Sequence, residues 1–195
     1  MSNLRTTEEI IKDCRNLLSS YRSGKLGKCP MPEDSNPGVD NLDIETRLVY
    51  FTLPMSLNYQ RDSYKLWQAV LNTYNDLSCR DIFSIEKLQN LDTEQLRLKL
   101  TKYKIALQPN KHINTYKTIS NTIYKNWKTI TKMLESVDYD FLKLKKLIQK
   151  DYKKDFPYLS GPKIFNYWSF ILGEYCKIKL KNKEYIDIAP DTHII

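Results

Sequence analysis

The sequence has few glycines and no long apolar segment. Only 5 of its 195 residues are glycine, and strand-like alternation of apolar and polar residues is rare, which argues against a β-sandwich or a barrel. No apolar run approaches the roughly 18 residues that a membrane span requires. The first residues, 1–7, also lack the apolar core of a signal peptide. We therefore expect an intracellular protein, in the cytoplasm, nucleoid or nucleus, with no membrane partner.

Metal-binding and common catalytic motifs are also missing. The sequence contains no C-x-x-C pair, no Gly-rich phosphate loop, no H-E-x-x-H and no G-x-S-x-G, which excludes the enzyme classes that depend on them. We expect no metal site and no cofactor, and we interpret the cysteines as reduced, mostly buried thiols. The cysteines and histidines of the chain are Cys14, Cys29, Cys79, Cys176, His112 and His193.

Positive charge is the main compositional bias. Thirty-one Lys and Arg residues stand against 23 Asp and Glu residues, giving a net charge of +8 and a pI near 9.1. This balance suits a polyanionic partner such as nucleic acid, because phosphate neutralisation supplies much of the affinity. Basic and aromatic residues also interleave between Tyr103 and Trp127. Their helical spacing favours core packing over base stacking.

Apolar residues recur at helical spacing along most of the chain, which predicts an all-α protein. Residues 1–41 are expected to form an N-terminal helix, capped by Thr6 with Glu9, and a Pro- and Gly-rich loop. Residues 42–195 are expected to form a helical domain. Its predicted helices span about 44–53, 62–74, 84–90, 92–103, 111–132, a lysine-rich segment beginning at Asp138 or Asp140, and 163–175. A small β-hairpin is predicted at 177–188.

Lys163 is the first candidate for chemistry, because it follows a Pro- and Gly-bearing turn and opens a helix. Desolvation at a helix N-terminus would favour the neutral amine that attacks carbon. Asp191 is a candidate carboxylate partner at a second expected helix start. The alternatives remain open at this point: Lys163 as an exposed lysine that contacts phosphate or water, and Asp191 as an ordinary N-cap.

These C-terminal motifs resemble those of the helix-hairpin-helix DNA glycosylases. The matching features are the turn 159–162, the helix that Lys163 opens, and the later segment Asp191-Thr192-His193. In lyase-competent members of that superfamily, a lysine directly follows the hairpin and an aspartate lies in a D-T-H-like segment. The order of helices from Asp43 onwards is also similar, although the specific motifs are confined to the C-terminal part of the chain.

The resemblance implies a multi-helix glycosylase-like domain with a helix-hairpin-helix motif at about 141–175. It implies a DNA glycosylase with AP-lyase activity that flips a damaged base, with an oxidised base as the first candidate, out of double-stranded DNA. Lys163 would attack C1′ and Asp191 would assist it. A monomer is expected. The DNA-binding residues would be Ser160, Gly161 and Pro162 in the hairpin and Asn58, Tyr59 and Gln60 in a wedging loop.

The chain also departs from the family pattern. Leu159 stands where the first hairpin glycine is usual, and Ser160 replaces an apolar residue. The expected 177–188 hairpin is similar to an insertion in the archaeal 8-oxoguanine branch, and the four-cysteine cluster of the endonuclease III branch is missing. The family continues after the aspartate with a helix, whereas this chain ends at Ile195. Either the chain is truncated or the site is incomplete.

Two other functions fit the same residues. One is a non-catalytic helix-hairpin-helix module that binds DNA through the turn and the lysines. The other is a helical protein-interaction scaffold without affinity for DNA. Spacing alone does not separate them from a glycosylase.

Overall fold

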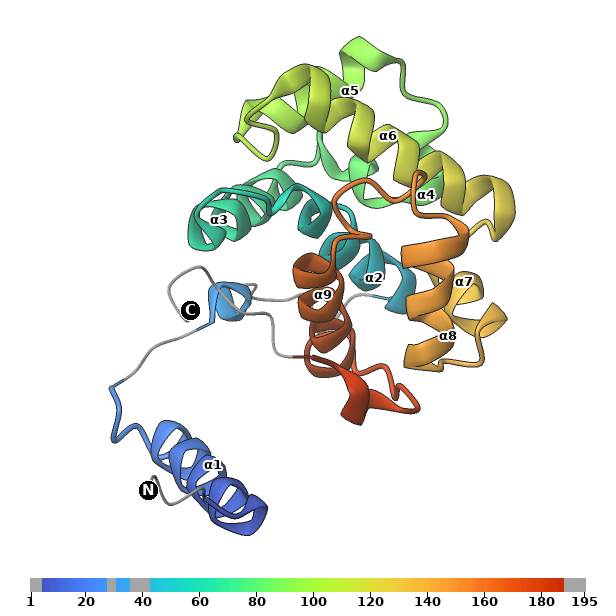
Figure 1. Cartoon of the computed structure of the whole chain (residues 1–195). Coiled ribbons are helices and arrows are strands. Elements are labelled where there is room, and N and C mark those ends of the chain that lie inside the picture. Colours follow the sequence, from blue (N-terminus) through green and yellow to red (C-terminus); the bar gives the residue numbers. More distant parts are fainter. Residues whose placement is uncertain (1–4, 28–30, 36–42, 188–195) are drawn as a thin grey trace. The chain divides into compact units, whose positions relative to one another are not determined.

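The computed structural model describes residues 5–27, 31–35 and 43–187 of the chain (Figure 1). The chain divides into two compact units, Met1–Asp34 and Ser35–Ile195. Asp191 and His193 lie outside the described residues. In the part that is described, no helix is long and apolar enough to cross a membrane.

The first unit consists mainly of helix α1, Thr7–Arg22. The predicted capping box is present: the Glu9 amide donates to the Thr6 hydroxyl, and the Thr6 amide donates to the Glu9 carboxylate at 2.8 Å. These two bonds satisfy donors that would otherwise have no partner in the first turn. The helix buries none of its side chains. A short 3₁₀ helix, η1 (Pro32–Ser35), follows at the boundary of the two units.

The second unit is also helical, and no strand occurs among the residues that the structure describes, which confirms the all-α prediction. Its α-helices are α2 (Ile44–Thr52), α3 (Ser63–Asn75), α4 (Ile85–Leu88), α5 (Thr93–Lys102), α6 (Pro109–Asn126), α7 (Ile130–Ser136), α8 (Phe141–Lys146) and α9 (Pro162–Glu174). The short helical turns are η3 (Pro54–Leu57), η4 (Arg80–Phe83), the π-helical η5 (Leu147–Asp151) and η6 (Lys183–Tyr185).

Aspartates begin four of these helices. Asp43, Asp62, Asp92 and Asp140 each accept hydrogen bonds from amides of the first turn of the helix that follows. Such a cap supplies a partner for an amide that the helix itself leaves open. At the start of α8 the sequence left two candidates, and the structure selects Asp140, which accepts from Leu142 and Lys143.

Helix α2 lies in the middle of the second unit, with α7 and α9 packed against it (Figure 1). Its buried aromatic residues, Tyr50 and Phe51, pack with Trp67 of α3 and Phe83 of η4. The indole N–H of Trp168 on α9 donates to the Thr52 hydroxyl at 2.9 Å, inside the core. This bond satisfies a buried polar group that would otherwise destabilise the fold.

The predicted β-hairpin at 177–188 is wrong for the described residues, 177–187. Lys181 instead pairs with the segment before α8: its amide donates to the Tyr139 carbonyl at 2.8 Å, and its carbonyl accepts from Phe141 at 3.0 Å. Residues expected in the second strand form the 3₁₀ helix η6. In the expected first strand, 177–180, the Ile178 amide donates to the Leu172 carbonyl and the Leu180 amide to the Ile178 carbonyl, so these amides are not available to a second strand.

Candidate nucleic-acid interface

Two loops that are far apart in the sequence meet through a pair of tyrosines. Tyr59 lies in the loop between η3 and α3, and Tyr158 lies in the turn before α9. Their rings stack, with centroids 5.3 Å apart and planes 28° from parallel. Tyr59 exposes 51% of its surface, so part of the pair faces solvent. An exposed tyrosine face is the kind of surface on which unpaired nucleobases stack.

Lys111, near the start of α6, contributes a positive charge to this pair. Its Nζ lies 5.1 Å from the centroid of the Tyr158 ring, within the range of a cation–π interaction. A hydrogen bond with Tyr158 raises the pKa of Lys111 above its usual value. The lysine is exposed, and it therefore presents a permanent cation beside the stacked rings.

Side-chain hydrogen bonds hold the loop that carries Tyr59 in place. The Arg61 guanidinium donates to the carbonyls of Ile105 at 2.6 Å and Lys104 at 3.1 Å. The Ser63 hydroxyl donates to the Asn58 side chain at 3.1 Å. Gln60 adopts a left-handed backbone conformation with φ of 51°. Asn58 therefore holds the loop, while Tyr59 and Gln60 are exposed at its tip.

The backbone amides of the turn before α9 are hydrogen-bonded within the turn. The Ser160 amide donates to the Phe156 carbonyl and the Gly161 amide to the Tyr158 carbonyl, both at 2.9 Å. The Ser160 hydroxyl donates to the Lys153 carbonyl at 3.1 Å. A phosphate bound at the Gly161 amide, as the resemblance implies, would have to displace the Tyr158 carbonyl.

Gly161 and Tyr158 are also constrained sterically by this turn. A Cβ atom at position 161 would lie 3.1 Å from the Tyr158 carbonyl oxygen, which is tighter than an ordinary contact. The left-handed residue of the turn is Tyr158, with φ of 61°, and not Leu159, which stands where the family usually has its first glycine. Leu159 is instead fully buried in the core.

Lys163 lies in the first turn of α9, directly after Pro162, and its side chain is exposed. The structure therefore does not show the burial of Lys163 on which the nucleophile hypothesis depends. Asp191, its expected partner, lies outside these residues, so the structure does not describe the separation of the two groups. The structure does bring the loop of Tyr59 and the turn that leads to Lys163 together.

Further lysines lie along the segment that leads into this turn, and a tyrosine of this segment contacts a tryptophan at the end of α6. Lys150, Lys153 and Lys154 are exposed. Tyr152 contacts Trp127 edge-on, with ring centroids 5.1 Å apart.

Of the interleaved aromatics that sequence spacing assigned to the core, Tyr116 is fully buried, and its hydroxyl donates to the Ile82 carbonyl. Sequence reasoning missed Tyr158, because its stacking partner is distant in the chain.

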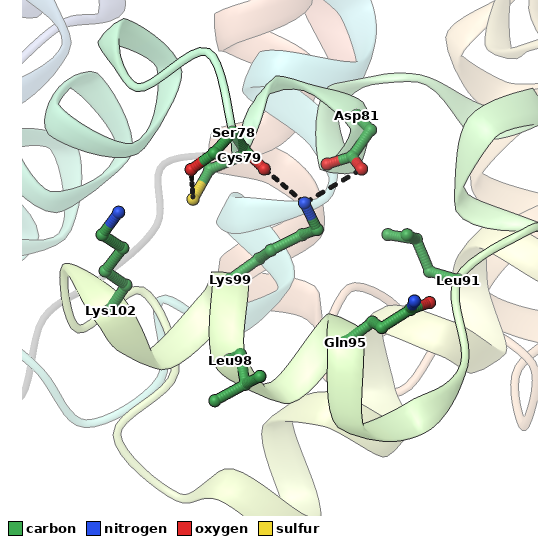
Figure 2. Close-up of a pocket in the computed structure, with 8 residues that line it drawn as sticks. All are labelled: Ser78, Cys79, Asp81, Leu91, Gln95, Leu98, Lys99 and Lys102. Atoms are coloured by element: carbon green, nitrogen blue, oxygen red, sulfur yellow. Dashed lines mark hydrogen bonds and ion pairs between the residues drawn. The ribbon is translucent and has the colours of Figure 1, made fainter.

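A separate cleft of about 420 Å³ lies between η4 and α5 (Figure 2). Its two lysines are already paired, Lys99 with Asp81 at 3.1 Å and Lys102 with Asp76 at 2.6 Å. Burial raises the pKa of the Cys79 thiol, which also lies here. The ion pairs of this cleft therefore join α5 to η4 and to the residue that ends α3. No group of His, Cys, Asp and Glu within the described part of the chain could hold a metal ion.

The fold and the exposed surface define a helical protein with an aromatic and basic face. No protein-family model, curated protein or solved structure matches the chain.

Proposed function

We propose that this protein binds DNA through the face formed by Tyr59, Tyr158 and Lys111, and that it acts there as a base-excision DNA glycosylase with lyase activity. The stacked tyrosine pair beside the exposed Lys111 ammonium is the observation that carries the binding proposal. It offers a π surface to an unpaired base and a cation to the adjoining phosphate. The net charge of +8 adds a field that attracts a polyanion.

The catalytic part of the proposal rests on the position of Lys163. The lysine opens α9 directly after the turn that contains Tyr158, so a nucleotide held at the tyrosines would approach it. After its ammonium group has lost a proton to a base, the Lys163 amine would form a bond to C1′ while the bond from C1′ to the base breaks, and the base would leave with that electron pair and take up a proton. Loss of the amine proton and ring opening would give a Schiff base, from which elimination of the 3′ phosphate cuts the strand.

Asp191 would support this reaction in one of two ways. Its carboxylate would accept the proton of the amine, or it would stabilise the positive charge that develops on the sugar. The damaged base would be flipped out of the duplex, and Gln60 or Tyr59 would fill the space that it leaves. Ser160, Gly161 and Pro162 would lie against the phosphate backbone.

The exposure of Lys163 favours a second candidate, a DNA-binding module without catalysis. An exposed lysine at a helix N-terminus is well placed to contact phosphate directly. In this case Lys163 and Asp191 have no covalent role, and replacement of Asp191 by Asn is tolerated.

Two experiments separate these functions. The first is a salt titration of binding to a duplex that contains an abasic site: strong salt dependence supports DNA binding, and negligible affinity at low salt would favour a protein-interaction scaffold. The second is borohydride reduction in the presence of a duplex that carries an oxidised base or an abasic site. A trapped covalent adduct that Lys163→Gln loses, while binding persists, supports the lyase; DNA binding without any adduct supports the module.

A further inference from the structure

Among the described residues of the first unit, no element covers the apolar face of α1. Five large apolar residues of this helix expose between 42% and 62% of their surface: Ile10, Ile11, Leu17, Leu18 and Tyr21. Cys14 is exposed as well. A helix of 16 residues, about 24 Å long, is marginal in water unless its apolar face is packed. This face is therefore expected to have an occupant.

The spacing of these residues is that of a two-helix seam. Ile10, Cys14, Leu17 and Tyr21 follow one another at intervals of four, three and four residues, the pattern of the a and d positions of a coiled coil. Ile11 and Leu18 widen the stripe on one side. Cys14 lies at the centre of the stripe, both along the helix and around it.

The charges of α1 favour a second copy over an anionic surface. Helix α1 carries the acidic residues Glu8, Glu9 and Asp13 and the basic residues Lys12, Arg15 and Arg22, so its two signs balance. A membrane-surface helix would instead have an excess of basic residues on its polar face. Balanced charge of both signs along an apolar stripe is typical of a helix that pairs with another helix.

The positions of Asp13 and Arg15 also select the orientation. They precede and follow Cys14 and therefore lie about 100° to either side of it, on opposite edges of the stripe. In a parallel pair each edge meets the opposite edge of the partner, so Asp13 faces the partner's Arg15. In an antiparallel pair centred on Cys14 each edge meets itself, which places like charges together. Asp13 already pairs with Arg5 at 2.9 Å in an exposed contact, and the partner's Arg15 would join or replace Arg5.

We infer that the protein forms a parallel homodimer through α1, in which Cys14 of one copy meets Cys14 of the other. Ile10 packs against the partner's Ile11, and Leu17 against the partner's Leu18. This dimer replaces the monomer that we expected from the sequence. One 16-residue helix per copy makes a small interface, so we expect a dissociation constant on the order of 10 µM.

The test uses the full chain in analytical ultracentrifugation from about 1 to 100 µM, a range that brackets the expected constant. We expect the mass to rise from monomer to dimer over this range. Leu17→Asp places a charge in the seam and should leave a monomer throughout. Ser19→Asp adds the same charge on the exposed polar face of α1 and should dimerise like the original chain. Far-UV circular dichroism and thermal unfolding confirm that both variants keep the fold of the second unit.

Thiol cross-linking tests the register and the orientation. In a Cys29→Ser background, a short bismaleimide should link Cys14 to Cys14, and Leu17→Asp should abolish the product. With Cys14→Ser added, Tyr21→Cys should cross-link to itself only if the helices are parallel. A monomer at all concentrations, a dimer that survives Leu17→Asp, or a Tyr21→Cys chain that does not cross-link while Cys14 does would each overturn the inference. A monomer whose α1 amides resist hydrogen exchange would show that the face docks within one chain instead.

Discussion

The carboxylate of Glu45, in the first turn of α2, accepts two hydrogen bonds from Thr131 of α7. The Thr131 amide donates at 2.9 Å and its hydroxyl at 2.7 Å. The other carboxylate oxygen of Glu45 accepts the amide of Ile130 at 2.7 Å. One side chain thus binds the open amides at the start of α7 from a helix that is distant in the sequence, which fixes the two helices relative to each other.

Replacement of Glu45 should therefore destabilise the second unit. Glu45→Ala removes the acceptor for three donors, and we expect a loss of about 2 kcal/mol of unfolding free energy, in the range for charged hydrogen bonds. Urea unfolding followed by circular dichroism measures the change. Glu86→Gln, at an exposed position of α4, is the control and should stay close to the original stability. Equal midpoints for Glu45→Ala and the original chain would show that water replaces the carboxylate.

The bond between Trp168 and Thr52 provides a second stability test. Thr52→Val keeps the shape of the side chain but leaves the buried indole N–H of Trp168 without its acceptor. We expect a cost of about 1–3 kcal/mol from the unpaired donor. Thr52→Ser keeps the hydroxyl and should lose only the contribution of a methyl group. If calorimetry shows that Thr52→Val is more stable than Thr52→Ser, the hydrogen bond contributes less to stability than the methyl group.

Asp76 should make the stability of the second unit depend on pH in the acidic range. The hydrogen bond from Lys102, followed by those from the Ser78 hydroxyl and amide, holds the pKa of Asp76 well below its usual range. A lowered carboxyl pKa contributes stability above the unfolded-state pKa of about 3.9, and this contribution is lost as the pH falls below that value. Asp76→Asn should thus lower stability at neutral pH and flatten its decline below pH ~4. Thermal midpoints across this range measure both effects, and an unchanged slope would contradict the assignment.

Tyr59 should contribute to nucleic-acid binding through its ring. Tyr59→Ala removes the exposed half of the stacked pair, and we expect a loss of about 1–3 kcal/mol in binding to DNA with an unpaired base. Tyr59→Phe keeps the ring and should bind nearly as well. Tyr185→Ala removes a comparably exposed tyrosine from η6 and serves as the control. Isothermal titration calorimetry at fixed salt makes the comparison, and equal losses for the Tyr59 and Tyr185 variants would remove the specific role of the pair.

Features that depend on neighbouring residues could be predicted from the sequence. The caps at Thr6, Asp43 and Asp92 need only an oxygen-bearing side chain and an amide a few residues later, and all three are present. The predicted helix at 111–132 was wrong in its length, because the structure ends α6 at Asn126 and starts α7 at Ile130. No glycine or proline marks this break.

The break has a local cause, the N-cap of α7 by Thr129, whose hydroxyl accepts from the Lys132 amide, and a long-range one. Lys128 adopts a left-handed conformation with φ of 71°, and Glu45 binds the amides at the start of α7. The same limit applies to the candidate interface. The resemblance to the glycosylases indicated Tyr59 in a loop between two helices, but its stacking on Tyr158 depends on the packing of α9 near η3. Long-range contacts of this kind leave no periodic signal in the chain.

The three tryptophans differ in burial, and their fluorescence therefore reports on different regions of the protein. Trp67 and Trp168 are fully buried in the core, whereas Trp127 is only partly buried and touches Tyr152, where the segment leading to Lys163 begins. Replacing Trp67 and Trp168 by phenylalanine would leave Trp127 as the single emitter. Its fluorescence would then report movement of that segment when a ligand arrives, without any added dye.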